Sequence, residues 1–288
     1  MGQNLRAIRR KIKTVKNIWQ ITRAMQMVSA AKLKRVQPVV EASREYMRRL
    51  TEITASVAAN CPAALHPYLE QRPIRAHGLV VIGGDKGLCG SHNVNLFRAA
   101  EEFLHAQAEP VKVICVGAKA VDHGRRRQWD VVHNALGPGL GDETRGALQI
   151  AREARALFDE GLVDTLHVAY TEFRSPMQRP PAVAQLIPII AASVGGDEGA
   201  ADYIFEPEAE QLLASLLPRT VEARLVNMLL QSLAAEHAAR MTAMSAATEN
   251  AEELRLTLTR QLNRARQQQI TSEILEVVSG ADALQQGE

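Results

Sequence analysis

The chain lacks the features of membrane-spanning and disulfide-bonded proteins. No run of about eighteen apolar residues occurs in its 288 residues, which excludes a transmembrane helix. The cysteines Cys61, Cys89 and Cys115 are widely spaced, so we expect a reducing compartment and no metal site. The N-terminus has no apolar core of a secretory signal peptide. Aromatic residues make up only 4% of the chain, and this scarcity favours long helices over a thick core.

Acidic residues are absent from positions 1–35, although the whole chain carries a formal net charge of only +2. The same stretch contains ten basic residues: Arg6, Arg9, Arg10, Lys11, Lys13, Lys16, Arg23, Lys32, Lys34 and Arg35. Such a stretch attracts acidic partners, which include nucleic acid, anionic lipid and acidic protein surfaces. No recognisable DNA-reading motif accompanies these residues. A solvated helix face is the remaining alternative.

Glycine and proline are missing from two long stretches, Gln3 to Gln37 and Arg219 to Ser279. In both stretches apolar residues recur three and four positions apart, which predicts long amphipathic helices. The first stripe consists of Leu5, Ile8, Ile12, Val15, Trp19, Thr22, Met25, Ser29, Leu33 and Val36. The second consists of Leu230, Leu233, Met241, Met244, Thr248, Ala251, Leu258, Leu262 and Ala265, and it resumes after a phase shift at Ile270, Ile274, Val277, Ala281 and Leu284. The phase shift is typical of a stutter in a coiled coil.

Two stripes of similar reach at opposite ends of the chain predict an antiparallel two-helix coiled coil. At 1.5 Å per residue the second helix would be roughly 90 Å long, and a helix with one apolar stripe needs a partner to hold its shape in water. We expect Pro38 to kink the first helix, which then ends near Asn60. We expect Pro218 in the first turn of the long second helix, after a separate short helix, because its missing N–H group costs nothing there.

Strand and helix patterns alternate between these two helices. Short apolar runs predict strands at residues 78–84, 111–116, 131–132, 165–170 and 183–190. Helical patterns follow at residues 91–107, after Gly117, and at residues 143–161. This alternation predicts an α/β layer with a largely parallel sheet, inserted between the two long helices.

The turn with most potential for chemistry is the glycine-rich segment 83–90, which separates an expected strand from an expected helix. Such a turn can bind phosphate through backbone N–H groups, but neither the dinucleotide spacing nor the P-loop pattern is present. Cys89 close to His92 would suit a thiol nucleophile with a histidine base. No paired-carboxylate, HExxH, GxSxG or CxxC set occurs, which argues against independent catalysis. The alternatives for this turn are a nucleotide-binding enzyme and a contact loop.

Several segments together resemble the γ subunit family of the F-type ATP synthase, and the resemblance covers nearly the whole chain. The segments that carry it are residues 12–17 and 21–32 near the start, 85–90 and 93–97 in the middle, 203–207 and 217–219 before the last helix, and 236–250, 263–267 and 270–280 at the end. Two pairs depart from the family pattern, Ile18-Trp19 and Ser91-His92.

The resemblance implies a coiled coil built from residues 1–60 and 208–288, with a Rossmann-like α/β domain inserted at residues 61–207. It implies a noncatalytic rotor that needs no cofactor. The coiled coil would turn inside a ring of alternating α and β subunits, and the α/β domain would join the ε subunit and the membrane c-ring. A basic helix pair suits a cavity lined with acidic loops, because complementary charge favours correct register and steering.

The resemblance also implies which residues contact partners and couple rotation to catalysis on the β subunits. These are Arg23, Met25, Asp85, Lys86, Cys89, Arg240, Gln267, Thr271 and Glu276. The resemblance implies no nucleic-acid partner. Because no mitochondrial presequence is recognisable, we expect a bacterial protein at the cytoplasmic face of the plasma membrane, held there by its complex.

Overall fold

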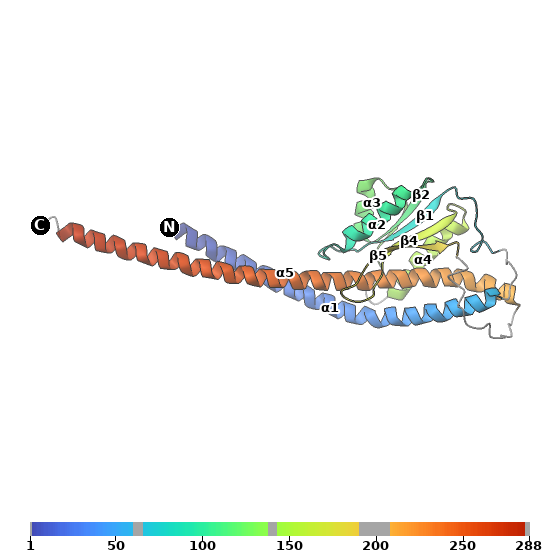
Figure 1. Ribbon diagram of the computed structural model, residues 1–288, viewed down its shortest axis with the longest axis horizontal. Helices are drawn as coiled ribbons and strands as arrows, with labels where there is room; N and C mark the ends of the chain where they lie inside the picture. Colours follow the sequence, from blue (N-terminus) through green and yellow to red (C-terminus); the bar gives the residue numbers. More distant parts are fainter. Residues whose placement is uncertain (1, 60–65, 138–142, 190–207, 286–288) are drawn as a thin grey trace. The chain divides into compact units, whose positions relative to one another are not determined.

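The protein is described here by a computed structural model, which defines residues 2–59, 66–137, 143–189 and 208–285 (Figure 1). The chain divides into two compact units, one made of residues 1–28 and 241–288 and the other of residues 29–240. Two long helices contribute to both units, α1 (Gly2–Ala59) and α5 (Ala209–Gln285). The domain boundaries predicted at residues 60–61 and 207–208 adjoin residues outside the described ranges, so they stay predictions.

In the first unit α1 and α5 run side by side in opposite directions (Figure 1). Val15 of α1 and Ala251 and Leu258 of α5 form a buried cluster, against which Ile12 and Trp19 pack. The hydroxyl oxygens of Thr22 and Thr248 lie 2.9 Å apart, and the Gln26 side-chain amide donates to the Ser245 hydroxyl at 3.3 Å. The predicted antiparallel coiled coil is confirmed, and Trp19, which departs from the family pattern, is part of its seam.

The apolar stripe of α5 continues beyond its partner helix. Because Thr22 lies opposite Thr248 and Gln26 opposite Ser245, the first turn of α1 is level with residues well before the end of α5. Of the resumed stripe, Ile270, Ile274 and Val277 are accordingly exposed, and Val277 reaches 72%. The predicted second part of the seam therefore has no partner within the described part of this chain.

The second unit is built around a five-stranded sheet in the order β3-β2-β1-β4-β5. Its strands are β1 (His77–Ile82), β2 (Val111–Val116), β3 (Val131–Ala135), β4 (Thr165–Thr171) and β5 (Pro181–Ile187). The strands β1 to β4 run parallel to one another, while β5 pairs antiparallel with β4. The largely parallel sheet predicted from the alternating pattern is confirmed, with β5 as the one antiparallel strand among those described.

Helices cover both faces of this sheet, as its continuous apolar strands require. On one face α2 (His92–Ala106) and α3 (Ala118–Arg127) pack against Leu79, Val81 and Cys115. The intervening side chains of β1 and β2 point to the other face. There α4 (Glu143–Asp159) contacts β1 and β4 and is joined to α5 by an ion pair between Arg155 and Glu222.

Pro38 and Pro218 both lie inside the long helices. The prediction that Pro218 stands in the first turn of the last helix is therefore wrong. The helix α5 begins at Ala209, so Pro218 stands in its third turn and no separate short helix precedes it. Pro38 likewise lies inside a continuous α1. A proline removes one backbone hydrogen bond from a helix, but Leu217 and Val221 beside Pro218 are fully buried. The burial of these neighbours in the core of the second unit offsets the lost bond.

Some predicted features fall outside the described residues. These are Asn60, Cys61 and the segment 203–207. The described α1 extends to Ala59, which agrees with a helix end near residue 60. Within the described ranges, the helices contain no window apolar enough for a membrane span.

Candidate functional site: the loop after β1

The sheet topology identifies one edge of the sheet as a candidate site. The chain leaves β1 to build β2 and β3 on one side and returns to place β4 on the other side. At such a switch point the loops after the two central strands diverge and leave a crevice, where doubly wound proteins bind ligands. In this chain the crevice lies between segment 83–90, which follows β1, and residues 172–173, which follow β4.

The helix α5 of the same chain occupies this crevice. Ser232 and Gln231 of α5 accept hydrogen bonds from the backbone N–H groups of Thr171 and Phe173, at 3.1 and 3.3 Å. One and two turns further along, the side chains of Glu236 and Arg240 contact segment 83–90. The polar side chains of a helix thus lie where a ligand binds in other proteins of this architecture.

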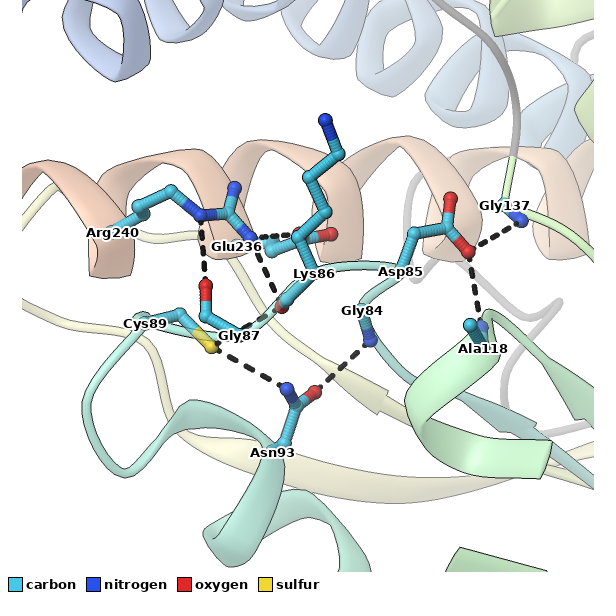
Figure 2. Close-up of polar contacts among 10 residues, drawn as sticks. All are labelled: Gly84, Asp85, Lys86, Gly87, Cys89, Asn93, Ala118, Gly137, Glu236 and Arg240. Atoms are coloured by element: carbon cyan, nitrogen blue, oxygen red, sulfur yellow. Dashed lines mark hydrogen bonds and ion pairs between the residues drawn. The ribbon is translucent and has the colours of Figure 1, made fainter. Parts of the chain in front are cut away.

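Arg240 holds the tip of segment 83–90 (Figure 2). Its Nε donates to the carbonyl oxygen of Gly87 at 3.2 Å, and its Nη2 donates to that of Lys86 at 3.1 Å. The same guanidinium pairs with Glu236, one helical turn away. Since Arg240 is only 7% exposed, its charge is compensated inside the protein, and its five donors suit this fork-like arrangement.

The start of the segment packs directly on the Glu236 carboxylate. A Cβ atom added to Gly84 would lie 2.9 Å from the Glu236 carboxyl carbon, so a larger residue here would require the Glu236 side chain to shift. The Gly84 N–H donates to the Asn93 side-chain oxygen at 3.0 Å, and the Asn93 amide donates to the Cys89 sulfur at 3.4 Å (Figure 2). The segment is thereby fixed at both ends.

Asp85 faces the interior of the unit. Its Oδ1 accepts hydrogen bonds from the backbone N–H groups of Ala118, at 3.1 Å, and Gly137, at 3.3 Å. Ala118 is the first residue of α3, and a carboxylate at a helix N-terminus is stabilised by the free N–H groups and the helix dipole. Asp85 therefore occupies the position where a phosphate would bind to α3.

These contacts argue against the nucleotide-binding alternative. The N–H groups of Gly84 and Ala118 already donate within the chain, and the Gly83 N–H donates to the Val116 carbonyl at 2.9 Å. Phosphate binding at this turn would have to displace the Asn93 side chain and the Asp85 carboxylate. In addition, no group of three or more His, Cys, Asp or Glu side chains in the described ranges is placed to hold a metal ion.

The Cys89 and His92 pair is not arranged for nucleophilic catalysis. Burial raises the pKa of the Cys89 thiol, and the nearby Glu236 carboxylate raises it further. Burial lowers the pKa of His92 to about 4, with additional effects from the positive charges of Arg179 and Arg240. Both shifts favour the neutral forms, whereas a reactive thiolate needs a lowered pKa. The Cys89 thiol instead packs under the loop and accepts from Asn93.

Two side chains of the segment point outward. Lys86 is exposed, and Leu88 is 61% exposed. Leu88 also has a φ of 62°, in the left-handed region that residues other than glycine seldom adopt. The segment therefore presents a cation and an apolar side chain on a backbone that Arg240, Asn93 and Asp85 hold from inside.

The structure separates the nine predicted contact residues into two groups. It brings Asp85, Lys86, Cys89 and Arg240 together at the loop after β1, as described above. The other five are Arg23, Met25, Gln267, Thr271 and Glu276, and they lie on α1 and α5 in the first unit.

The five residues of the first unit lie along α1 and α5, and Thr271 and Glu276 stand on the part of α5 that extends beyond α1. The guanidinium of Arg23 lies 5.0 Å from the centre of the Trp19 ring, and Met25 is half-buried. Gln267 and Glu276 are exposed. The exposed Thr271 donates its hydroxyl to the Gln267 carbonyl at 3.0 Å, in the manner of a helical threonine. Four of these five side chains are open to solvent.

Sequence reasoning missed three residues of the loop site as functional residues. Glu236 and Asn93 were noticed only within longer motifs, and Leu88 only as part of the turn. The spacing of Glu236 and Arg240, four positions apart on one helix, signals an ion pair. No sequence signal showed that this pair meets the loop, because residues 86 and 240 are brought together only by the folded sheet.

The fold and the site define a class of protein: an antiparallel coiled coil with an inserted doubly wound α/β domain, whose ligand-binding edge is closed by the coiled-coil helix. A family model described as ATP synthase matches residues 4–284. Together with the relatives below, this match shows that the chain belongs to the ATP synthase gamma chain family.

Curated relatives match along almost their entire length. An ATP synthase gamma chain of Desulfitobacterium hafniense is 41% identical over 97% of this chain and 99% of its own. That of Moorella thermoacetica is 40% identical, with 98% and 99% coverage. That of Anaeromyxobacter sp. is 41% identical over the same shares.

Solved structures show the same fold at low sequence identity. The rotor of the Euglena gracilis mitochondrial ATP synthase in rotational state 1 contains a chain with a TM-score of 0.67 and 18% identity, covering 94% of this chain and 100% of its own. A chain from the central stalk and c-ring of the Tetrahymena thermophila mitochondrial enzyme has a TM-score of 0.58 and 22% identity, with 79% and 99% coverage.

Proposed function

We propose that this chain is the central rotor subunit of a proton-translocating ATP synthase and has no catalytic activity of its own. It turns inside the ring of α and β subunits and couples proton flow through the membrane sector to ATP synthesis or hydrolysis on the β subunits. The observation that carries the proposal is full-length identity of about 40% to ATP synthase gamma chains, joined to a coiled coil of the chain's two ends.

The physical argument for coupling rests on the two groups of contact residues. The exposed basic residues of α1 attract acidic surfaces of the surrounding ring, which favours correct register. As the rotor turns, contacts at Arg23, Met25, Gln267, Thr271 and Glu276 and at the loop after β1 would favour one state of each β subunit over another. The shift in population is limited by the difference in contact free energy between those states.

The partners follow from the same proposal. The α and β subunits surround the helix pair, and the ε subunit and the c-ring bind the second unit. The complex works at the cytoplasmic face of a bacterial plasma membrane. The similar structures, a rotor and a central stalk with its c-ring, support these partners, and the bacterial relatives support the location.

The test is co-purification from cells that express a tagged copy. We expect α, β and ε subunits and the c-ring to accompany the chain in stoichiometric amounts, and we expect the isolated chain to hydrolyse no ATP. A matched copy lacking residues 219–288 should lose the assembly. Recovery of the full chain without these partners would contradict the proposal.

Binding of nucleic acid by the basic helix is the competing outcome. A salt titration with duplex DNA measures it, because neutralised phosphates give a steep dependence of affinity on salt. We expect no binding at modest salt.

A further inference from the structure

A buried histidine stands at the opposite end of β1 from the loop described above. His77, the first residue of this strand, is 4% exposed. Its Nε2 has no hydrogen-bond partner among the described residues. A buried polar atom without a partner costs free energy, so its presence calls for an explanation. A candidate partner is the Glu109 carboxylate in the turn between α2 and β2, whose Oε2 lies 3.5 Å from Nε2.

The other ring nitrogen of His77 is already bonded. Its Nδ1 lies 2.7 Å from the Thr165 hydroxyl oxygen, and the Nδ1 of His167 lies 3.5 Å from the same oxygen. A neutral imidazole has one N–H group, whereas a protonated imidazole has two. A protonated His77 donates through Nδ1 to Thr165 and through Nε2 towards Glu109, whose side chain is 44% exposed and has room to approach. The site therefore satisfies the protonated ring more completely than the neutral ring.

The surroundings of His77 suit a single positive charge. The His167 ring on β4 has its centre 5.9 Å from that of His77. Burial, with a smaller contribution from the charge of His77, lowers the pKa of His167 to about 4, so His167 stays neutral when His77 is protonated. On α2 the neighbouring side chain is the uncharged Phe103, with ring centres 6.4 Å apart. On β2, Lys112 stands opposite Gly78, and its side chain points to the other face of the sheet.

The carboxylate of Asp164 also lies near this end of the sheet, but other groups occupy it. It accepts from the backbone N–H groups of Arg75 and Ala76, at 2.8 and 3.4 Å, and pairs with the Arg75 guanidinium at 3.4 Å. These contacts, the bond from the Arg75 N–H foremost, lower the pKa of Asp164. Arg75 therefore balances the charge of Asp164, and Glu109 remains to balance a charge on His77.

We propose that His77 is a proton-binding site which controls the turn between α2 and β2. When His77 is protonated, it pairs with Glu109 and ties this turn to the start of β1. When His77 is neutral, the turn is held by the bond from the His77 N–H to the Pro110 carbonyl, at 2.9 Å. Imidazole ordinarily changes its charge between pH 5 and 8, so acidification of the surrounding compartment tightens the turn. The proposal goes beyond the proposed function and does not depend on it, because the isolated chain shows the effect.

Hydrogen exchange of the isolated full chain at pH 7.5 and pH 5.5 tests the proposal. After correction for the intrinsic effect of pH, we expect protection of the amides at residues 107–111 to rise about threefold at pH 5.5, as an ion pair with a half-exposed partner allows. Nitrogen NMR of the His77 ring, assigned with H77N, should show both nitrogens protonated at pH 5.5 and one at pH 7.5. A ring that stays neutral at pH 5.5 would overturn the proposal.

The matched pair of variants is E109Q and E102Q. Glu109 and Glu102 are both exposed, the latter on α2, so neither substitution requires repacking of the core. E109Q should abolish the rise in protection, since a neutral amide forms no ion pair, while E102Q should keep it. Equal responses of the two variants would show that Glu109 is not the partner of His77 and would reject the proposal.

Two substitutions of His77 itself separate the two ring nitrogens. The amide of glutamine reaches the position of Nε2, so H77Q should give high protection at both pH values. The amide of asparagine reaches only the position of Nδ1, so H77N should give low protection at both. H167Q should keep the response of the unaltered chain, because His167 is not the group that gains the proton. A rise at low pH in H77Q or H77N would contradict the assignment; if these buried variants do not fold, E109Q and E102Q still decide.

Discussion

At the scale of single residues, the loop after β1 shows how charge is used inside this protein. Arg240 and Glu236 are both buried, which is expensive for an isolated charge and tolerable for a pair with further hydrogen bonds. Here two backbone carbonyls supply those further bonds. Removal of one partner leaves the other buried and unpaired, so substitutions at these positions have consequences far larger than at exposed ion pairs.

Reversal of the charge at position 240 tests this directly. R240E places a second carboxylate next to Glu236 and in front of two carbonyl oxygens, so the loop must leave the helix. We expect the coupling of ATP hydrolysis to proton pumping in membrane vesicles to fall more than the yield of assembled complex. The control is R98E, a charge reversal on the exposed surface of α2. Unchanged pumping in R240E would show that the position is a bystander.

The buried His92 predicts a pH dependence of stability. Its pKa is lowered from 6.5 to about 4 in the folded chain, chiefly by burial. The unfolded chain therefore binds a proton between these values that the folded chain does not, and stability is lost as the pH falls from 6.5 towards 4. The loss from this group reaches roughly 3 kcal/mol at the acidic end.

Urea denaturation at several pH values between 7.5 and 4 measures the effect. The variant H92Q should have a flatter profile than the unaltered chain, while H105Q, at an exposed position on the same helix, should leave the profile unchanged. Parallel profiles for H92Q and the unaltered chain would contradict the assignment.

At the scale of elements, the helix pair of the first unit combines an apolar seam with polar contacts across it. Val15, Ala251 and Leu258 exclude water, whereas the Thr22 and Thr248 hydroxyls meet at 2.9 Å. Thr248 donates to the Thr22 hydroxyl, which in turn donates to the Trp19 carbonyl of its own helix at 3.1 Å. The polar contact therefore contributes to register at little cost in satisfied hydrogen bonds.

A double-mutant cycle at this contact measures its contribution. T22V and T248V should each lower the free energy of unfolding of the first unit by about 1 kcal/mol, because one hydroxyl loses its partner. The double variant should lose less than the sum, since two valines pack without an unpaired hydroxyl. Trp19 fluorescence in a W129F background reports on this seam. Strict additivity would show that the hydroxyls do not interact.

At the scale of the whole molecule, successive parts of α5 pack against different parts of the chain. Within the second unit, residues 209–240 of α5 pack against the sheet domain and against α1, which they meet at the Thr54–Thr220 and Ser43–Asn227 hydrogen bonds. Within the first unit, residues 241–269 pair with the start of α1. The remaining turns expose Ile270, Ile274 and Val277. A stripe of this kind contributes little to the stability of the isolated chain, and it is suited to burial by a partner.

Truncation after residue 269 distinguishes the paired part of α5 from its exposed end. We expect the urea midpoint of the isolated chain to stay the same, because the removed side chains are exposed, and we expect self-association in sedimentation experiments to decrease. Truncation after residue 250 is the control, since it removes Ala251 and Leu258 from the seam and should destabilise the first unit. A large loss of stability on the shorter deletion would contradict the exposure of Ile270, Ile274 and Val277.

The sequence by itself determined the types of element and the pairing of the two ends. Repeats of three and four residues in the stripes and short apolar runs between glycines are local properties, and the strands and helices appear within a few residues of their predicted bounds. The long helix start was misplaced because the usual preference of Pro218 for a first turn was overridden by packing around Leu217 and Val221.

Only the tertiary structure decided what the glycine-rich loop does. The same turn could have bound a phosphate, and its own residues do not reveal that Asp85 caps α3 or that Arg240 and Glu236 fill the crevice. The physical reason is that a local pattern sets the period of an element, whereas contacts between residues 84–88 and 236–240 depend on the order of strands in the sheet. That order places α5 against the loop, so that Arg240 and Glu236 hold its backbone where a ligand could otherwise bind.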